Sequence, residues 1–436
     1  MSVGFVGLAH LGVVSSIAAA AKGLDVVAFD PDAGRVEALS QGRLPIAEPG
    51  LAGLLTASGS CIRFTGEPSA LRGCDVILLA ADVPTNERNE SELALIHRLL
   101  QLTVSCAAPG AVIVILSQVA PGFTNEAEQR IRSTHPERGL AVFYQVETLV
   151  MGRAVERAMQ PERFIVGCRR PRDPLPAPYA DYLERFAAPI IRMRYASAEL
   201  AKIAINMYLA SQVCTTNTLA DLCEAIGADW QEIVPALTSD QRIGPYAYLA
   251  PGLGFSGGNV ERDLVTVTRL AQAHGADARL VEAWLAHSRY RRDWALTTLK
   301  RELSGSQDPI IAVWGLAYKP QTASMKNAPA AAFLDALAPV PAQVYDPQLT
   351  VEQGRFPHVV TASSALEACR GAAALVVMTP WEEFAQVGLH ALQGVMRGRT
   401  IVDPYGALDG PLCAQLGFRY RRLGAPREPA VHMAST

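Results

Sequence analysis

The chain has 436 residues, of which 50% are hydrophobic and 19% charged, and its formal net charge is −3. This length is too great for one ordinary hydrophobic core, so we expect two or three domains, and the composition excludes a disordered or fibrous chain. No run rich in lysine and arginine occurs, so we predict no nucleic-acid partner.

The eight cysteines are scattered and form no C-x-x-C pair. In a chain of this size, that pattern indicates reduced thiols in a cytoplasmic protein and predicts neither a disulfide framework nor a metal site. The apolar start, residues 3–21, has no basic segment before it, so we do not interpret it as a signal peptide. Because no other segment has about 18 uninterrupted apolar residues, we expect no membrane span.

Over residues 1–195, short apolar runs alternate with helical stretches. Continuous apolar runs of this length are typical of parallel strands that are covered by helices on both faces. We expect strands at residues 3–6, 25–29, 76–80, 111–116, 141–144 and 164–166. This alternation predicts an α/β, doubly wound, Rossmann-like domain.

Residues 196–304 lack this alternation of strands and helices. No proline or glycine occurs between Ala196 and Ile226, so we predict one long helix that ends at Gly227. Further helix is expected at residues 263–274 and 278–303. Residues 305–424 resume the βα alternation and predict a second Rossmann-like domain, with strands at 310–314, 343–345, 375–378 and 400–402. We expect the tail, residues 425–436, to be disordered.

A glycine-rich turn follows the first predicted strand. Gly7 and Gly12 are the first and third glycines of a G-x-G-x-x-G pattern, and Ala9 stands at the middle position. Asp30 follows the second predicted strand, where a carboxylate would accept the ribose hydroxyls of NAD and repel the extra phosphate of NADP. The order of strand, turn, helix, strand and acid predicts NAD binding.

Residues 254–263 read Gly-Phe-Ser-Gly-Gly-Asn-Val-Glu-Arg-Asp. This loop resembles the catalytic loop of the nucleotide-sugar dehydrogenases, the family of UDP-glucose and GDP-mannose dehydrogenases, which reads Gly-Phe-Gly-Gly-Ser-Cys-Phe-Pro-Lys-Asp. Similar stretches occur at residues 44–51, 83–85, 117–122, 240–244 and 315–322. The resemblance extends over almost the whole chain, and it implies that Asn259 stands where the family has its nucleophilic cysteine.

The resemblance implies an NAD-dependent oxidoreductase that acts on a nucleotide sugar, most simply a UDP-sugar, and a homodimer formed through the long central helix. It implies catalytic positions at Glu147, Lys202, Asn206, Asn259 and Asp263. The implied cofactor contacts are Gly7, Ala9, His10, Leu11, Gly12, Asp30, Arg35, Val83, Pro84, Thr85 and Gln118. The implied substrate contacts are Glu147, Lys202, Asn206, Arg242, Tyr248, Gly254, Tyr318 and Lys319.

The chemistry of the retained side chains suits an oxidation. Lys202 and Asn206 are four residues apart on the predicted helix and therefore share one face. A lysine there can stabilise an alkoxide, and an asparagine can donate to the same oxygen. Asp263 is suited to act as a base or to order water.

Other family positions differ, because Gln118, Gln145, Met151 and Asn259 replace threonine, asparagine, glutamate and cysteine. An amide cannot form the thiohemiacetal that the family uses to reach the acid. Three hypotheses follow. The chain removes a single hydride and yields an aldehyde or ketone, or it reaches the acid through the aldehyde hydrate without a thioester, or it binds NAD and a nucleotide sugar without catalysis and acts through a partner.

Overall fold

The computed structural model describes residues 1–86, 88–305, 307–352 and 354–426. The chain divides into two compact units, residues 1–205 and 206–436. From residue 427 on, the tail that we expect to be disordered lies outside the described residues. The division into three domains, with boundaries near residues 195 and 304, stays a prediction.

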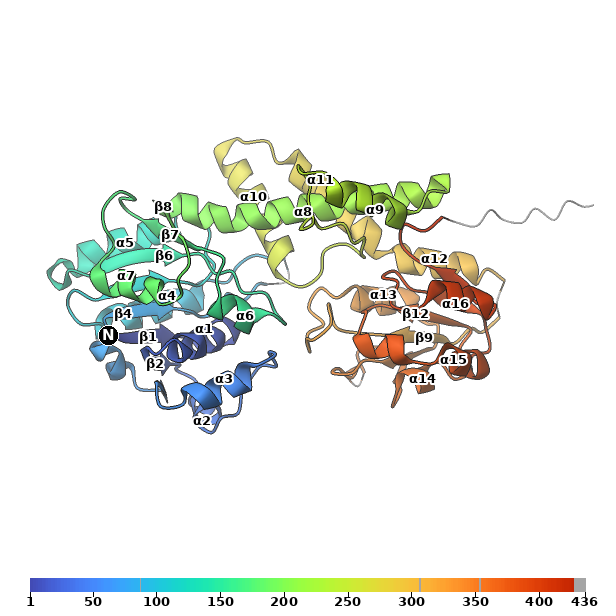
Figure 1. Ribbon diagram of the computed structural model, residues 1–436, viewed down its shortest axis with the longest axis horizontal. Helices are drawn as coiled ribbons and strands as arrows, with labels where there is room; N and C mark the ends of the chain where they lie inside the picture. The colour runs from blue at the N-terminus through green and yellow to red at the C-terminus, as the bar shows by residue number, and fades with distance from the viewer. Residues whose placement is uncertain (87, 306, 353, 427–436) are drawn as a thin grey trace, which may run out of the picture. The chain divides into compact units, whose positions relative to one another are not determined.

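The first unit is built on one sheet in the order β3-β2-β1-β4-β5-β6-β7-β8 (Figure 1). Its strands are β1 (Ser2–Val6), β2 (Asp25–Phe29), β3 (Ile62–Thr65), β4 (Val76–Leu79), β5 (Val112–Ile115), β6 (Ala141–Gln145), β7 (Phe164–Cys168) and β8 (Ile190–Arg194). All neighbouring strands are parallel except β6 and β7, which are antiparallel. Our expectation of a purely parallel sheet is therefore wrong at this pair, because apolar periodicity carries no information on strand direction.

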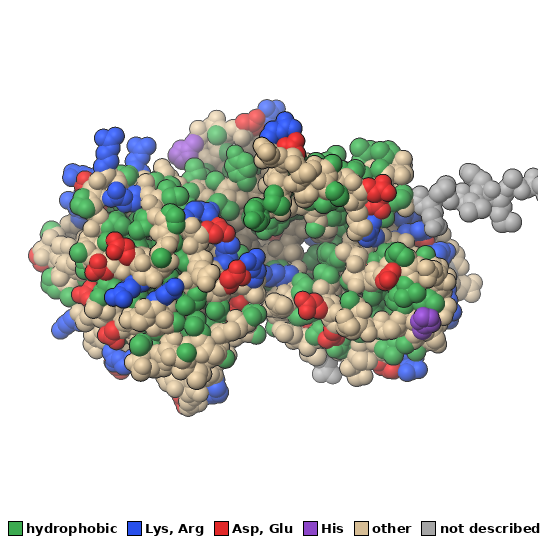
Figure 2. Space-filling model, viewed as in Figure 1, with side chains coloured by type: hydrophobic (Ala, Val, Ile, Leu, Met, Phe, Trp, Pro, Cys, Tyr) green, Lys and Arg blue, Asp and Glu red, His purple; other side chains and the backbone are tan. Residues whose placement is uncertain are grey.

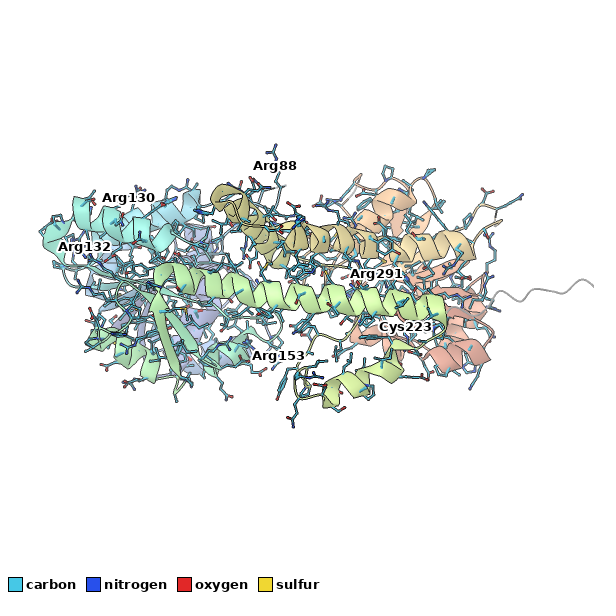
Figure 3. All side chains as sticks on the ribbon, turned by 90° about the horizontal axis from the view of Figure 1, so that it is seen from above. Arg88, Arg130, Arg132, Arg153, Cys223 and Arg291 are labelled. Atoms are coloured by element: carbon cyan, nitrogen blue, oxygen red, sulfur yellow. The ribbon has the colours of Figure 1, made fainter. Side chains whose placement is uncertain are left out.

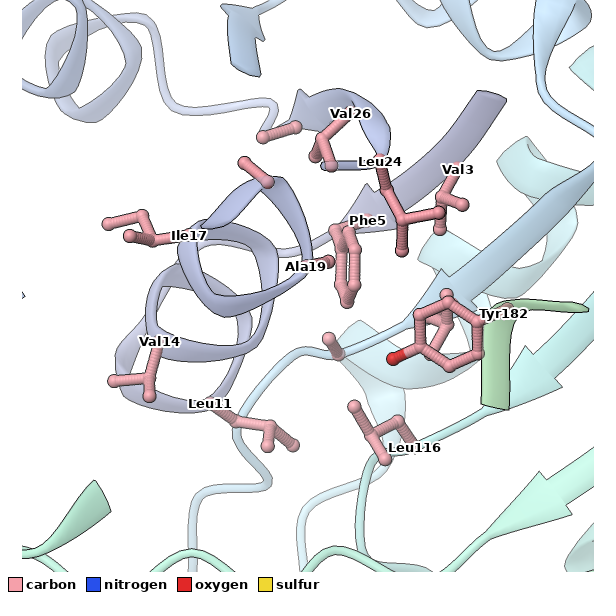
Figure 4. Packing of buried hydrophobic residues seen from close by; sticks show 14 of the residues in the cluster. Val3, Phe5, Leu11, Val14, Ile17, Ala19, Leu24, Val26, Leu116 and Tyr182 are labelled. Carbon is pink, nitrogen blue, oxygen red and sulfur yellow. The ribbon is translucent and has the colours of Figure 1, made fainter. Parts of the chain in front are cut away.

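The strands β4, β5 and β7 of the first unit are buried on both faces, as their continuous apolar sequences predict. Val3 and Phe5 belong to the core on one face, whereas Val6 belongs to the core on the other. Figure 4 shows Ala19 of helix α1 beside Phe5, with Tyr182 on the opposite side of the ring. The helices of this unit are α1 (His10–Ala21), α2 (Ala33–Ser40), α3 (Leu51–Ser58), α4 (Ala94–Cys106), α5 (Phe123–Thr134), α6 (Ala154–Met159) and α7 (Ala177–Glu184).

Helix α8 (Tyr195–Ile226) begins in the first unit and ends in the second. Its bounds confirm the predicted long helix, and Gly227 ends it with a φ of 83°, a left-handed conformation that suits glycine. The other helices of the second unit are α9 (Trp230–Ser239), α10 (Asn259–His274), α11 (Arg279–Arg292), α12 (Trp294–Glu302), α13 (Pro329–Leu337), α14 (Ala365–Ala368), α15 (Leu389–Val395) and α16 (Gly410–Gln415).

The helix expected at residues 278–303 is two helices, α11 and α12, and that expectation is corrected here. Asp293 ends the first helix and starts the second. Arg291 of α11 is fully buried against α8, where it pairs with Asp221 at 2.9 Å and Glu224 at 3.3 Å (Figure 3). The indole nitrogen of Trp294 donates to the second oxygen of Glu224 at 2.8 Å, so the break lets both helices contact one carboxylate on α8.

The second unit also contains a parallel sheet, in the order β11-β10-β9-β12-β13-β14. Its strands are β9 (Ile311–Trp314), β10 (Ala342–Tyr345), β11 (Val359–Thr361), β12 (Ala374–Val377), β13 (Thr400–Val402) and β14 (Arg419–Arg421). Ile311 and Val313 face one core and Ala312 and Trp314 the other, which again places cores on both faces. The α/β class and the two Rossmann-like sheets are thus confirmed.

The surface mixes charges of both signs. On the face that Figure 2 shows, Lys and Arg side chains are interspersed with Asp and Glu side chains on each unit. In the part of the chain that the structure describes, no helix is both long enough and apolar enough to cross a membrane.

Candidate functional site

Packing in the turn between β1 and α1 requires glycine at two positions. Gly7 has a φ of 91°, and a Cβ there would lie 2.6 Å from the Cβ of Ala81. A Cβ on Gly12 would lie 1.7 Å from the carbonyl oxygen of Gly7. The first and third glycines therefore allow α1 to start close against the strand, and its first amides face the carboxyl edge of the sheet. Ala9, at the middle position, lies just before α1 in extended conformation.

Asp30 lies at the end of β2, as predicted, and its carboxylate is buried. One oxygen accepts from the Leu8 amide at 2.6 Å and from the Arg35 guanidinium at 2.9 Å. The other accepts from the Asp32 amide at 2.9 Å. Because each carboxylate oxygen has two lone pairs, the second oxygen retains capacity for a ribose hydroxyl. The structure thus brings Asp30 and Arg35 to the glycine turn.

Asp82 also lies at this turn, and sequence reasoning missed it. It follows β4, next to the predicted cofactor residues Val83, Pro84 and Thr85. Its carboxylate accepts from the amides of His10 at 2.8 Å and Leu11 at 3.4 Å, the first two residues of α1. The sequence signal that could have identified Asp82 is an acidic residue directly after a buried strand of an α/β unit.

Glu48 joins two segments of the site and was also missed. It accepts from the His10 ring at 2.8 Å and from the Gly152 amide at 2.9 Å. It lies in the Pro-Ile-Ala-Glu-Pro-Gly segment, whose likeness to the family was the available signal. Through Glu48, the start of α1 is tied to the loop that carries Glu147.

Lys202 and Glu147 form an ion pair inside the first unit. The Lys202 ammonium lies 3.3 Å from a Glu147 oxygen, and their side chains are 13% and 16% exposed. The other Glu147 oxygen accepts from the Leu149 amide. Lys202 therefore does not lie on a solvated helix face, and the pair of opposite charges is largely shielded from water.

Glu199, one turn before Lys202, holds the segment that carries Gln118. Its buried carboxylate accepts from the amides of Gly122 at 2.7 Å and Thr124 at 2.8 Å, at the start of α5. Burial raises the pKa of Glu199, and the bonds from these two amides oppose that shift. Gln118 lies in the turn between β5 and this helix start, at the carboxyl edge of the sheet.

In the second unit, Asn206 and Asp263 are in direct contact. The Asn206 amide donates to one Asp263 oxygen at 2.5 Å, and the Arg262 guanidinium lies 3.3 Å from the other. Asp263 and Arg262 are both buried. Asn259, by contrast, is the exposed first residue of α10. The loop thus presents Asn259 outward while it fixes Asp263 inside.

The loop before α10 packs tightly on its neighbours within the second unit. Gly254 has a φ of 77°, and a Cβ there would lie 2.4 Å from the Ser288 carbonyl oxygen. A Cβ on Gly257 would lie 3.0 Å from the Tyr318 ring. The Asn327 amide donates to the Gly257 carbonyl at 2.9 Å and to Glu261 at 2.7 Å. Tyr318 and Asn327 therefore both lie against the loop, and the role of Tyr318 in substrate binding stays a prediction.

The other predicted substrate residues are less closely tied to this loop. The Lys319 ammonium lies 5.8 Å from the centre of the Tyr318 ring. Arg242 is 88% exposed and pairs with Asp240 at 2.7 Å, and this acceptor raises the pKa of the guanidinium. Tyr248 is exposed, and its amide donates to the Gln212 side chain at 2.9 Å. Their roles in substrate binding stay predictions.

A Rossmann-like sheet with a glycine turn after β1 and a buried acid at the end of β2 is the arrangement of a dinucleotide-binding enzyme. The chain matches three models of the UDP-glucose/GDP-mannose dehydrogenase family: the NAD-binding domain over residues 1–176, the central domain over 196–288 and the UDP-binding domain over 312–410. The chain belongs to this family.

Named relatives match along nearly their whole length. The UDP-glucose 6-dehydrogenase of Rhizobium meliloti is 31% identical, with 98% of this chain and 100% of that protein covered. The enzyme of the same name from Pseudomonas aeruginosa is 29% identical, with 97% of each covered. Among solved structures, a UDP-glucose dehydrogenase from Pyrobaculum islandicum superposes with a TM-score of 0.84 at 24% identity, with 98% of each chain covered.

Proposed function

We propose that this chain is an NAD-dependent dehydrogenase that oxidises an alcohol carbon of a nucleotide sugar, a UDP-sugar, in a single two-electron step. Support for the substrate class comes from the match to the family's UDP-binding domain. The observation that supports one oxidation and not two is Asn259. It is an exposed amide at the loop position where the family resemblance implies a nucleophilic thiol.

The proposed step needs an acceptor for a hydride and one for a proton. NAD, which the glycine turn and Asp30 would hold, would supply the acceptor for the hydride, and the hydroxyl proton would leave to a base or to water. The positive charge of Lys202 stabilises the developing alkoxide, and Glu147 holds that ammonium in place. Asp263, which Asn206 holds in place, is the candidate base for this proton. The products are the carbonyl compound, NADH and a proton.

A second oxidation through a thioester requires a reactive thiolate. Burial raises the pKa of Cys214 on α8 to about 12, so this thiol stays protonated at neutral pH. Cys223 on the same helix is also buried, and burial raises its pKa as well. Both therefore support the interpretation of core thiols, and neither replaces the missing nucleophile.

The number of NADH molecules formed per sugar consumed tests the proposal. Purified protein is incubated with excess NAD and each member of a UDP-sugar and GDP-sugar panel, and NADH and residual sugar are both measured. We expect one NADH per sugar and a product that reacts with a carbonyl reagent. Two per sugar would support acid formation without a thioester, and none would support a binding protein without catalysis.

Restoring a thiol separates a missing nucleophile from a wider defect. We expect Asn259→Cys to raise the ratio from one toward two. Ser256→Cys, which adds a thiol to the same loop three residues earlier, is the matched control and should leave the ratio at one. An unchanged ratio in Asn259→Cys would place the limit at other altered positions, such as Gln118 or Met151.

We also infer that the chain forms a homodimer through α8. Over residues 206–226, its part in the second unit, this helix exposes four large hydrophobic side chains, Tyr208, Leu219, Leu222 and Ile226, and Leu200 is exposed nearer its start. The four are spaced by 11, 3 and 4 residues, which places them on one face of the helix. Leu219, Leu222 and Ile226 form an apolar cluster at the end of the helix, and an exposed cluster of this kind marks an interaction surface.

A further inference from the structure

The N-terminus of α1 is the place where a dinucleotide presents its diphosphate in a Rossmann-like unit. The first amides of a helix have no partner within the helix, and the helix dipole favours a negative group there. In this chain, the amides of His10 and Leu11 already have an acceptor, the carboxylate of Asp82. A negative group of the protein itself therefore occupies the position that suits the diphosphate.

The packing of the turn does not require an acid at position 82. Ala81 is the residue whose backbone and Cβ lie against Gly7. The second unit offers an internal comparison, because Thr379 lies against Gly315 in the same manner and the next residue is Pro380. The close approach of strand and turn is thus satisfied by the preceding residue in both units.

The charges around Asp82 are mixed. His10 lies at the start of α1 and pairs with Glu48, while Glu147 comes from the loop after β6 and pairs with Lys202. Asp82 is exposed as a residue, whereas desolvation raises the pKa of its carboxyl group, which the His10 side chain lowers and Glu147 raises. Rotation of the side chain into solvent would release both amides and remove this desolvation.

We propose that Asp82 competes with the diphosphate of the dinucleotide for the N-terminus of α1 and thereby weakens and gates cofactor binding. The cofactor binds after the carboxylate has left the two amides. Asp82 is a residue that sets affinity in this proposal, and it takes no part in the chemical step. The proposal rests on NAD binding by the first unit and not on which oxidation follows.

The test is a direct binding measurement by calorimetry with NAD and with ADP-ribose, which carries the same diphosphate without nicotinamide. Removing one negative charge from beside the diphosphate should tighten both affinities about tenfold in Asp82→Ala. Asp82→Ser keeps a neutral acceptor for the helix amides and should shift both affinities in the same direction. This second variant covers the case in which Asp82→Ala loses stability.

Asp75→Asn is the matched control. Asp75 lies at the other end of β4 and accepts from the Ser2 amide at 2.9 Å, so its removal changes the charge equally without touching the α1 terminus. Its affinities should equal those of the unchanged protein. Equal or weaker NAD binding in folded Asp82→Ala and Asp82→Ser, or binding in none of the variants, would overturn the proposal. Tightened binding together with no NADH from any sugar would uphold it while refuting the proposed oxidation.

Discussion

At the scale of single residues, the ion pair of Lys202 with Glu147 is the feature closest to the proposed chemistry. Both side chains are mostly shielded from water, so the ammonium has few alternative partners. Lys202→Met removes the charge and keeps the length of the side chain. We expect kcat to fall by about 10²- to 10³-fold, the usual effect of losing one donor to a developing oxyanion. Steady-state NADH formation measures this, with NAD affinity unchanged.

Lys300→Met provides the matched control, because Lys300 is an exposed lysine near the end of α12. Its kcat should remain that of the unchanged protein. If Lys202→Met retained full activity, the ion pair would be structural and the proton and oxyanion work would have to fall to Asp263 and Asn206.

The thiols give a second prediction at this scale. Because the pKa of Cys214 is about 12, only about one molecule in 10⁴ carries the thiolate at pH 8. A thiol introduced at position 259 would be exposed at a helix N-terminus, where thiol pKa values fall below their usual range. We therefore expect Asn259→Cys to be alkylated by iodoacetamide at pH 8 within minutes while Cys214 stays unmodified. Peptide mass spectrometry reads both sites in one sample, and rapid labelling of Cys214 would contradict its burial.

At the scale of elements, Glu199 links α8 to the start of α5. Its removal leaves the amides of Gly122 and Thr124 without their acceptor in a buried position. Loss of such a partner costs about 1–3 kcal/mol, and we expect Glu199→Ala to lower the free energy of unfolding by that amount. Glu126→Ala, an exposed acid in the first turn of the same helix, should change it far less. Urea unfolding measures both.

Because of the Glu199 carboxyl group, we also expect the free energy of unfolding to depend on pH. Burial raises the folded-state pKa of Glu199 above its ordinary value of 4.5, so the folded state binds this proton more tightly than the unfolded state does. The stability that follows is present below about pH 4.5 and is lost as pH rises through the folded-state pKa. Glu199→Gln cannot ionise, so the stability of the unchanged protein relative to this variant should fall with rising pH. A constant difference would contradict the raised pKa.

The central strands could be predicted from sequence because each is apolar on both faces, as in β4 and β5. The edge strands β8 and β14 could not, since Ile-Ile-Arg-Met-Arg and Arg-Tyr-Arg are partly exposed and resemble loops. At the site, Lys202 and Asp263 were found through motifs on single segments. Asp82 and Glu199 were missed because their backbone partners lie 71 and 72 residues away for Asp82 and 75 and 77 for Glu199, beyond the reach of local patterns.

At the scale of the whole molecule, both units use the same solution for the turn after their first strand. Gly-Leu-Ala occurs at residues 7–9 and again at residues 315–317. Asp30 accepts from the Leu8 amide at 2.6 Å, and Asp346 accepts from the Leu316 amide at 2.7 Å. A glycine with positive φ exposes the next amide to the sheet edge, and a carboxylate from the neighbouring strand satisfies it. The repeated motif therefore has a structural reason that is independent of any ligand.

The proposed dimer is also a property of the whole molecule, and the exposed apolar cluster on α8 determines its test. Leu222 and Ile226 are 51% and 66% exposed, although they lie one turn apart on a helix whose opposite side is buried. If a second copy covers them, Leu222→Asp together with Ile226→Asp buries two charges without partners in the interface, which is strongly unfavourable. We expect this double variant to halve the mass measured by light scattering at micromolar concentration while its circular dichroism is unchanged. Val360→Asp, at a site on β11 that is 67% exposed, is the matched control and should keep the dimer mass. Burial of the apolar side chains of Leu219, Leu222 and Ile226 is the driving force for this interface. A monomeric unchanged protein, or a double variant of dimer mass, would therefore contradict it.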